Sequence, residues 1–153
     1  MVSVIILLFS FSLQANEFNV KEFGKKYYKT WTKTQAPEAT KKDLHNYLDL
    51  LKEDVGHQHF PYDPDDVRHS DGKALMLEGM THYLGGHTEY SSQLISLDTL
   101  DDQVIVVVYD TQSKLTRPNG ELLEQNYRTM EILELEDHKV SVIRKYSKKI
   151  RIE

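Results

Sequence analysis

The sequence of 153 residues contains no cysteine. It can therefore form no disulfide, no zinc site with thiolate ligands and no cysteine nucleophile, and it cannot carry a lipoprotein anchor. Proline and glycine are also scarce, with four and seven residues, and neither is concentrated in one stretch. No linker, low-complexity segment or internal repeat is evident after Asn16, so we expect a single domain.

Excess positive charge is absent as well. The formal net charge is −5, which argues against a nucleic-acid-binding protein, and the basic run RKYSKKIRIE at the end of the chain is too short to reverse it. Apolar residues make up 39% of the chain and charged residues 28%, which is typical of a globular protein with a real core.

The first apolar run is too short to cross a bilayer, because it extends for about 12 residues from Val2 to Leu13. Small or polar residues follow it, and Leu13-Gln14-Ala15 resembles a cleavage site, although no Lys or Arg precedes the run. We expect residues 1–15 to be a signal peptide and residues 16–153 to form the mature domain. The protein would then be periplasmic or secreted, without stable membrane anchoring after cleavage. The alternative is a buried N-terminal strand or helix.

Three helices are expected in the first half of the chain. The first places apolar residues every three or four positions and ends near Gln35, the second begins after Thr40 with Asp43 completing a capping box, and the third begins after Ser70 or Asp71. Gly85-Gly86 should end the third helix. The expected buried faces are Val20, Phe23, Tyr27 and Trp31 in the first helix, Leu44, Tyr47, Leu48 and Leu51 in the second, and Met76, Met80, Tyr83 and Leu84 in the third.

The second half of the chain has the period of strands. The segments EYSSQLISL, QVIVVVYD, ELLEQNYRTMEILELE and KVSVIRKY are separated by the turn signals DD, PNG and DH. Short turns join antiparallel neighbours, so these four strands should form a meander. The continuous apolar run from Val104 to Tyr109 suggests a central strand that is covered on both faces. With a short strand near residue 57, the fold class is α+β.

This order of elements resembles the nuclear transport factor 2-like superfamily, in particular its SnoaL-like and ketosteroid-isomerase-like branch. The segment DLHNYLDLLKEDVGHQH is similar to the second helix and first strand of that superfamily, and EILELEDHKVSVIRKY is similar to the closing hairpin of SnoaL-like chains. The resemblance covers residues 20 to 148. It implies a cone-shaped fold, with a curved antiparallel sheet carrying about three helices on its concave face. It also implies a homodimer formed through the sheet.

The resemblance places two catalytic candidates. When the acidic pair Glu53-Asp54 is aligned with that of ketosteroid isomerases, the general base falls on His59, where imidazole replaces the usual Asp. The family's protonated acid falls on Glu131, whose apolar neighbours would favour the neutral form. The family's tyrosine donor corresponds to Tyr27 or Tyr28. In the alternative interpretation, Glu131 is a residue of the sheet surface or the dimer interface and not an acid.

His57 and His59 have three possible roles. Alternate strand residues share a face, so we expect both to point into the cone, with Phe60 on the other side and Pro61 ending the strand. They could be hydrogen-bonded pocket residues, ligand or acid/base contacts, or two ligands of a metal with His69, His82 or His87 as the third. No spacing demands a metal, and we expect none.

The expected pocket binds a small hydrophobic organic molecule without a cofactor. Its predicted lining is His57, His59, Tyr27, Trp31, Met80 and Tyr83, and Arg128 or Arg144 would bind an anionic ligand or pair with Glu131. The leading hypothesis is acid/base chemistry of the isomerase, dehydratase or cyclase type. The alternatives are a binding module without turnover and a dimerising interaction domain. The superfamily hosts all of these, so the fold does not choose among them.

Overall fold

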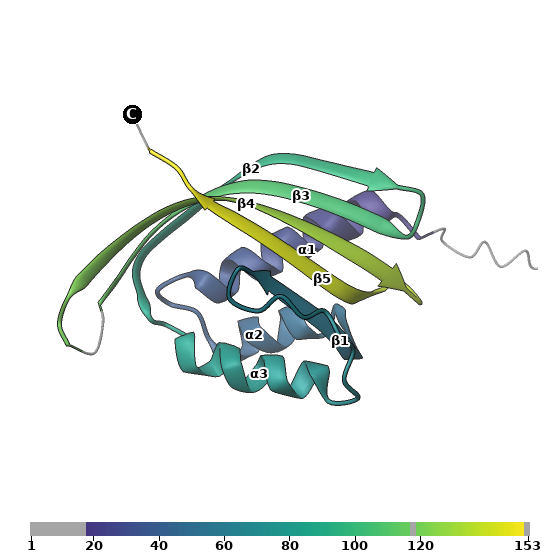
Figure 1. Cartoon of the computed structure of the whole chain (residues 1–153), viewed down its shortest axis with the longest axis horizontal. Helices are drawn as coiled ribbons and strands as arrows, with labels where there is room; N and C mark the ends of the chain where they lie inside the picture. The colour runs from purple at the N-terminus through teal and green to yellow at the C-terminus, as the bar shows by residue number, and fades with distance from the viewer. Residues whose placement is uncertain (1–17, 117–118, 152–153) are drawn as a thin grey trace, which may run out of the picture.

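The described part of the chain forms three helices and five strands in the predicted α+β order (Figure 1). The computed structural model describes residues 18–116 and 119–151, and the predicted signal peptide lies outside these residues. The helices are α1 (Val20–Gln35), α2 (Lys41–Leu48) and α3 (Gly72–Tyr83), and the strands are β1 (Leu51–Phe60), β2 (His87–Leu100), β3 (Val104–Thr116), β4 (Leu122–Glu136) and β5 (Lys139–Lys149). Among the described helices, none is long and apolar enough to span a membrane.

The five strands form one sheet in the order β1-β5-β4-β3-β2. Strands β2 to β5 are an antiparallel meander, as predicted from the turn signals between them. Strand β1 is longer than expected and runs parallel to β5, with Leu51 opposite Val140 and Phe60 opposite Tyr146. The sheet is therefore mixed, because its first strand joins the edge of the meander beside the last one.

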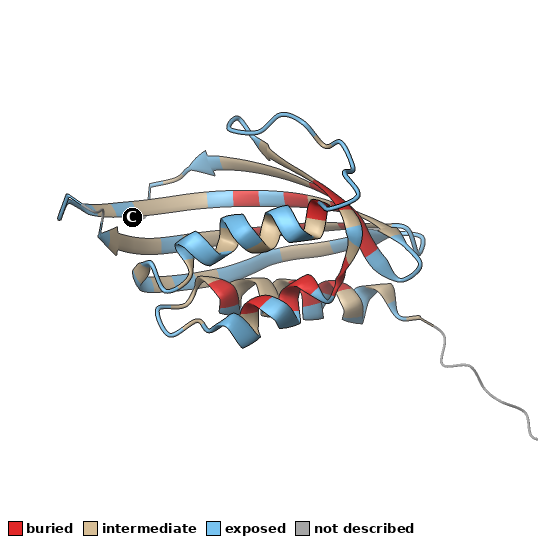
Figure 2. Ribbon diagram, turned by 90° about the horizontal axis from the view of Figure 1, so that it is seen from below, coloured by how far each residue is buried: buried red, intermediate tan, exposed pale blue. Residues whose placement is uncertain are grey.

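The helices lie on the concave side of the curved sheet (Figure 1). Helix α1 crosses β2 and β3, α3 packs on β1, and α2 contacts both other helices. The core is the layer between α1, α2 and the sheet, where Tyr27, Leu44 and Ile105 are at most 1% exposed. In Figure 2, α3 is buried only at its first turn. The rest of this helix lies over the sheet without packing tightly against it.

Two predicted burial patterns are wrong. Strand β3 is not covered on both faces: Ile105, Val107 and Tyr109 are buried, whereas the alternate valines are only partly covered. Helices lie on one face only, so the convex face of the strand stays open. Of the predicted buried face of α3, Tyr83 is 79% exposed, and Met76 and Met80 are partly exposed.

The local signals for helix ends are confirmed. Thr40 and Asp43 form the reciprocal capping box at the start of α2, and Gly85 follows α3 with a φ of +69°. The prediction for Leu51 is wrong, because α2 ends at Leu48 and Leu51 is the first residue of β1. Pairing with Val140 on β5 draws Leu51 into the sheet.

Candidate functional site

A cavity of about 820 Å³ lies between α3, the end of α1 and the sheet edge formed by β1 and β5. The loop that joins β1 to α3 contributes a further side. Apolar lining comes mainly from the helices and includes Trp31, Leu75, Met76 and Met80, while polar lining comes from the strands and the loop and includes His57, His59, Asp63, Asp65, His69 and Lys145. The cavity is of the size that small organic ligands occupy in proteins.

His57 and His59 both lie on the cavity wall. Their rings are 6.1 Å apart between centroids, as alternate residues of one strand face require. Phe60 is on the opposite face, near Tyr146 and half exposed. A tight turn then returns the chain, with reciprocal backbone hydrogen bonds of 2.8 Å between His59 and Asp63. The roles of the histidines as ligand contacts stay predictions.

Both imidazoles are uncharged at neutral pH. Burial, followed by the positive charge of Lys145, lowers the pKa of His59 to about 4. Burial and Lys145 lower the pKa of His57 as well. Each ring can therefore accept one hydrogen bond and donate another to a molecule in the cavity.

The pKa shift of His59 predicts a loss of stability in acid. Between about pH 6.5 and pH 4 the unfolded state binds a proton at His59 and the folded state does not, so the free energy of unfolding falls as the pH falls. The ring is half-buried, and solvent screening limits the effect to about 1 kcal/mol. Urea unfolding at pH 7 and pH 5, compared between the wild type and His59→Asn, measures this contribution. A His59 ring that titrates near pH 6.5 by NMR would contradict it.

A polar row crosses three neighbouring strands at the level of His59. His59 pairs with Lys145 of β5, and Lys145 pairs with Glu131 of β4. The Lys145 ammonium lies 3.3 Å from a Glu131 carboxylate oxygen and 4.1 Å from the centre of the Trp31 ring. Sequence reasoning missed Lys145 as a site residue. The signal was its spacing from Ile143. Lys145 lies two residues after Ile143 and therefore on the same face of β5, which the apolar side chain of Ile143 marks as the inward one.

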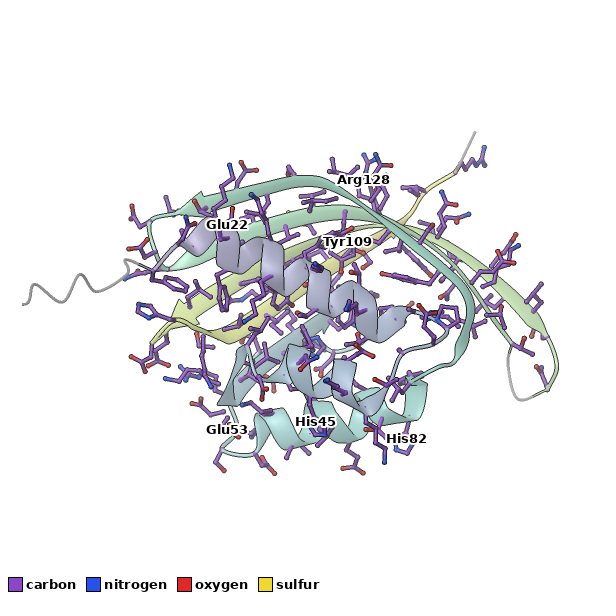
Figure 3. The ribbon with its side chains drawn as sticks, turned by 180° about the vertical axis from the view of Figure 1, so that it is seen from behind. Glu22, His45, Glu53, His82, Tyr109 and Arg128 are labelled. Carbon is purple, nitrogen blue, oxygen red and sulfur yellow. The ribbon has the colours of Figure 1, made fainter. Side chains whose placement is uncertain are left out.

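Glu131 is buried behind the cavity and does not line it. Its two carboxylate oxygens accept hydrogen bonds from the Tyr27 hydroxyl at 2.8 Å and the Tyr109 hydroxyl at 2.6 Å. Figure 3 shows Tyr109 between the sheet and α1. Burial raises the pKa of both tyrosines, which keeps them protonated as donors. The Tyr47 hydroxyl is 3.1 Å from that of Tyr27 and joins the same network.

Not all of the predicted pocket residues come together. Trp31, His57, His59, Met80 and Tyr83 line the cavity, whereas Tyr27 and Glu131 belong to the buried network. The alternative donor Tyr28 is hydrogen-bonded to Ser92 at 2.8 Å. Whether any of these residues contacts a ligand or a proton stays a prediction.

The two arginines for which we expected an anionic ligand or Glu131 do not line the cavity, and the expected pairing with Glu131 is wrong. Arg128 forms a bidentate ion pair with Asp110. Arg144 pairs with Asp66 at 2.8 Å and with Glu134. Arg144 lies next to Lys145 in β5, so the alternation of strand side chains places it on the other face.

The histidines do not converge on a metal geometry. Of the possible third ligands, His69 lines the cavity, His82 is exposed at the end of α3 (Figure 3), and His87 bonds to the Gln35 carbonyl at 2.9 Å. In the two described ranges, 18–116 and 119–151, no three His, Cys, Asp or Glu side chains are grouped as a metal site would need.

Comparison with known proteins identifies the fold. No family model and no curated protein matches the sequence. Among solved structures, the chain is similar to a protein from Shewanella denitrificans described as a SnoaL-like polyketide cyclase, with a TM-score of 0.66, 8% identity and coverage of 84% of this chain and 90% of that one. It is also similar to a protein from Kribbella flavida described as a ketosteroid isomerase, with a TM-score of 0.59, 16% identity and coverage of 88% of this chain and 81% of that one. A third similar structure is an LEH-like epoxide hydrolase of M. tuberculosis, with a TM-score of 0.61, 9% identity and coverage of 84% of each chain.

These identities are low enough that the comparisons bear on the fold alone. They agree with the fold that the sequence resemblance implies, namely an α+β arrangement of helices on a curved sheet. The chain therefore shares its fold with these SnoaL-like and ketosteroid-isomerase-like structures.

Proposed function

We propose that this protein binds a small organic molecule in the cavity between α3 and β1. The observation that carries the proposal is the division of the cavity wall into an apolar side from the helices and a polar side with His57, His59 and Lys145. Ligand sites typically combine a large apolar surface with a few polar groups that fix orientation. The fold is one that hosts cyclases, isomerases and hydrolases, which supports a small-molecule site.

Proton transfer is the second candidate, favoured by the position of His59 beside Lys145. An uncharged imidazole can accept a proton from a bound molecule, and the ammonium would stabilise the anion that remains. A pKa of about 4 makes His59 a weak base, but an anion forming near it would raise that pKa. Lys145 takes the stabilising role that the resemblance assigns to Glu131, because Lys145 reaches the cavity. The chemistry would need no cofactor.

Two alternatives involve no turnover: a binding module, which the geometry of the cavity serves equally well, and a dimerising interaction domain. Export of the mature chain to the periplasm or the medium and homodimerisation through the sheet stay predictions from the first residues and the resemblance.

Gly79 offers a test, because it lines the cavity from the middle of α3 and a Cβ atom placed on it meets no heavy atom within 4 Å. Gly79→Trp should fill space in the cavity and abolish binding without disturbing the core. The measurement is ligand-observed NMR with a fragment library of bicyclic aromatic acids, amides and alcohols. We expect fragments that bind the wild type and are lost in Gly79→Trp.

Gly79→Ala is the matched control and should keep those fragments, since a methyl group occupies little of the cavity. Circular dichroism should show the same secondary structure for both variants. A library without any fragment that Gly79→Trp displaces would overturn the proposed function.

A further inference from the structure

The Lys145 ammonium has a free side toward the cavity, and this observation narrows the class of ligand. We propose that the ligand is a monoanion with an apolar body, whose single acidic group binds Lys145 beside His59 while the body lies against α3. The inference rests on the proposed function and specifies its ligand.

The Lys145 ammonium has more N–H donors than polar partners. An ammonium carries three N–H groups, yet the only polar contact of Lys145 within the described ranges is the ion pair with Glu131. At 3.3 Å this pair is longer than the 2.7–2.9 Å of charge-assisted hydrogen bonds. The side chain is 11% exposed and lines the cavity, so a molecule bound there can supply a further partner. An acceptor on a ligand would satisfy a cation that the protein leaves partly bare.

The position of the ammonium is fixed before a ligand arrives. The Trp31 ring lies 4.1 Å from it on one side, a cation–π distance, and Glu131 holds it from behind. Glu131 in turn accepts the hydroxyls of Tyr27 and Tyr109, which fix its carboxylate. A preorganised cation gains affinity because little side-chain entropy remains to be lost on binding.

The charges around the cavity favour one negative charge and oppose a second. Near His59 they are Lys145 on β5, Glu131 on β4 and Asp63 on the returning loop, while His57 is uncharged. Asp65 adds another carboxylate to the loop side of the lining. An acidic group at Lys145 is attracted by the one Lys or Arg side chain of the described lining, whereas a second acidic group would meet no further cation there and would be repelled by the loop carboxylates of Asp63 and Asp65.

Three matched probes test this charge preference: 2-naphthoate, the uncharged 2-naphthamide and the dianion 2,6-naphthalenedicarboxylate. We expect calorimetry at pH 7 and low salt to show that the wild type binds 2-naphthoate about tenfold more tightly than 2-naphthamide, the size expected for a charge-assisted hydrogen bond. The dicarboxylate should bind less tightly than 2-naphthoate.

Lys145→Gln should bring 2-naphthoate down to the affinity of 2-naphthamide and leave 2-naphthamide unchanged. If removing the cation beside Glu131 unfolds the domain, the double variant Glu131→Gln/Lys145→Gln removes both charges and permits the same measurement. Asp65→Asn keeps an oxygen acceptor for the Val67 amide and should raise the affinity for the dicarboxylate.

The outcomes separate this inference from the proposed function. Equal affinity of the wild type for 2-naphthoate and 2-naphthamide, or a preference that survives Lys145→Gln, would overturn the monoanion inference while the pocket still binds organic molecules. Failure of all three probes to bind, together with no displaceable fragment in the Gly79→Trp experiment, would overturn both.

Discussion

Replacing Glu131 with alanine is expected to lower the free energy of unfolding by about 3–5 kcal/mol, the range found when one partner of a buried ion pair is removed. Glu131 is 1% exposed and accepts hydrogen bonds from Tyr27 and Tyr109. Alanine would leave both hydroxyls without an acceptor and Lys145 without its counter-charge. Urea unfolding followed by circular dichroism at pH 7 measures the loss.

Two control variants separate charge from packing. Glu131→Gln keeps an acceptor for one tyrosine and should cost less than alanine. Glu131→Leu combined with Lys145→Met replaces the pair with apolar groups of similar size, and such replacements are often close to neutral. A double variant as unstable as Glu131→Ala would mean that the tyrosine hydrogen bonds, and not the ion pair, carry the stability. A loss below 1 kcal/mol for Glu131→Ala would contradict the buried network.

Gly72→Ala is expected to cost about 2–3 kcal/mol, because the first residue of α3 lies directly against the backbone of β1. A Cβ atom at Gly72 would lie 2.3 Å from the carbonyl oxygen of Val55, well inside contact distance. The helix would have to move away from the strand, and this would also change the cavity that the two elements enclose. Chemical denaturation measures the cost.

The same substitution later in the same helix should have the opposite sign. Gly79→Ala meets nothing within 4 Å and replaces the residue that α-helices tolerate worst after proline, so we expect a gain of about 0.8–1 kcal/mol. If both variants are stabilising, α3 does not pack on β1 as closely as the structure shows. Comparing Gly72→Ala with Gly79→Ala separates the effect of tertiary contact from that of helix propensity, because both variants make the same substitution in the same helix.

Much of the fold could be predicted from the sequence because it depends on neighbouring residues. The capping box of Thr40 and Asp43 and the glycine after α3 are local signals, and the structure confirms both. The turn signals likewise predict the antiparallel meander. Burial was predicted less well: the apolar runs in β3 and α3 identify elements but do not show which face another layer covers.

Part of the candidate site could be predicted from the sequence. The predicted part depends on residues that are close together in the sequence, and the rest depends on residues that are far apart. His57 and His59 share a strand face because they are two residues apart, and the structure places both on the cavity wall. Glu131 was singled out through the resemblance, but its distance from the cavity depends on how far α1 approaches the sheet. Lys145 was missed because its spacing from Ile143 indicates the inward face of β5 but does not show that a cavity lies on that face at this point of the strand.

The sequence by itself determined the type and order of the elements, the capping box that begins α2, the glycine after α3 and the side of β1 that carries the two histidines. Only the tertiary structure decided that β1 pairs in parallel with β5, which brings His59 next to Lys145. Periodicity and capping arise from contacts within a few residues, which each segment carries on its own. The register of distant strands is set by packing across the whole sheet, so no short segment specifies the partners of its side chains.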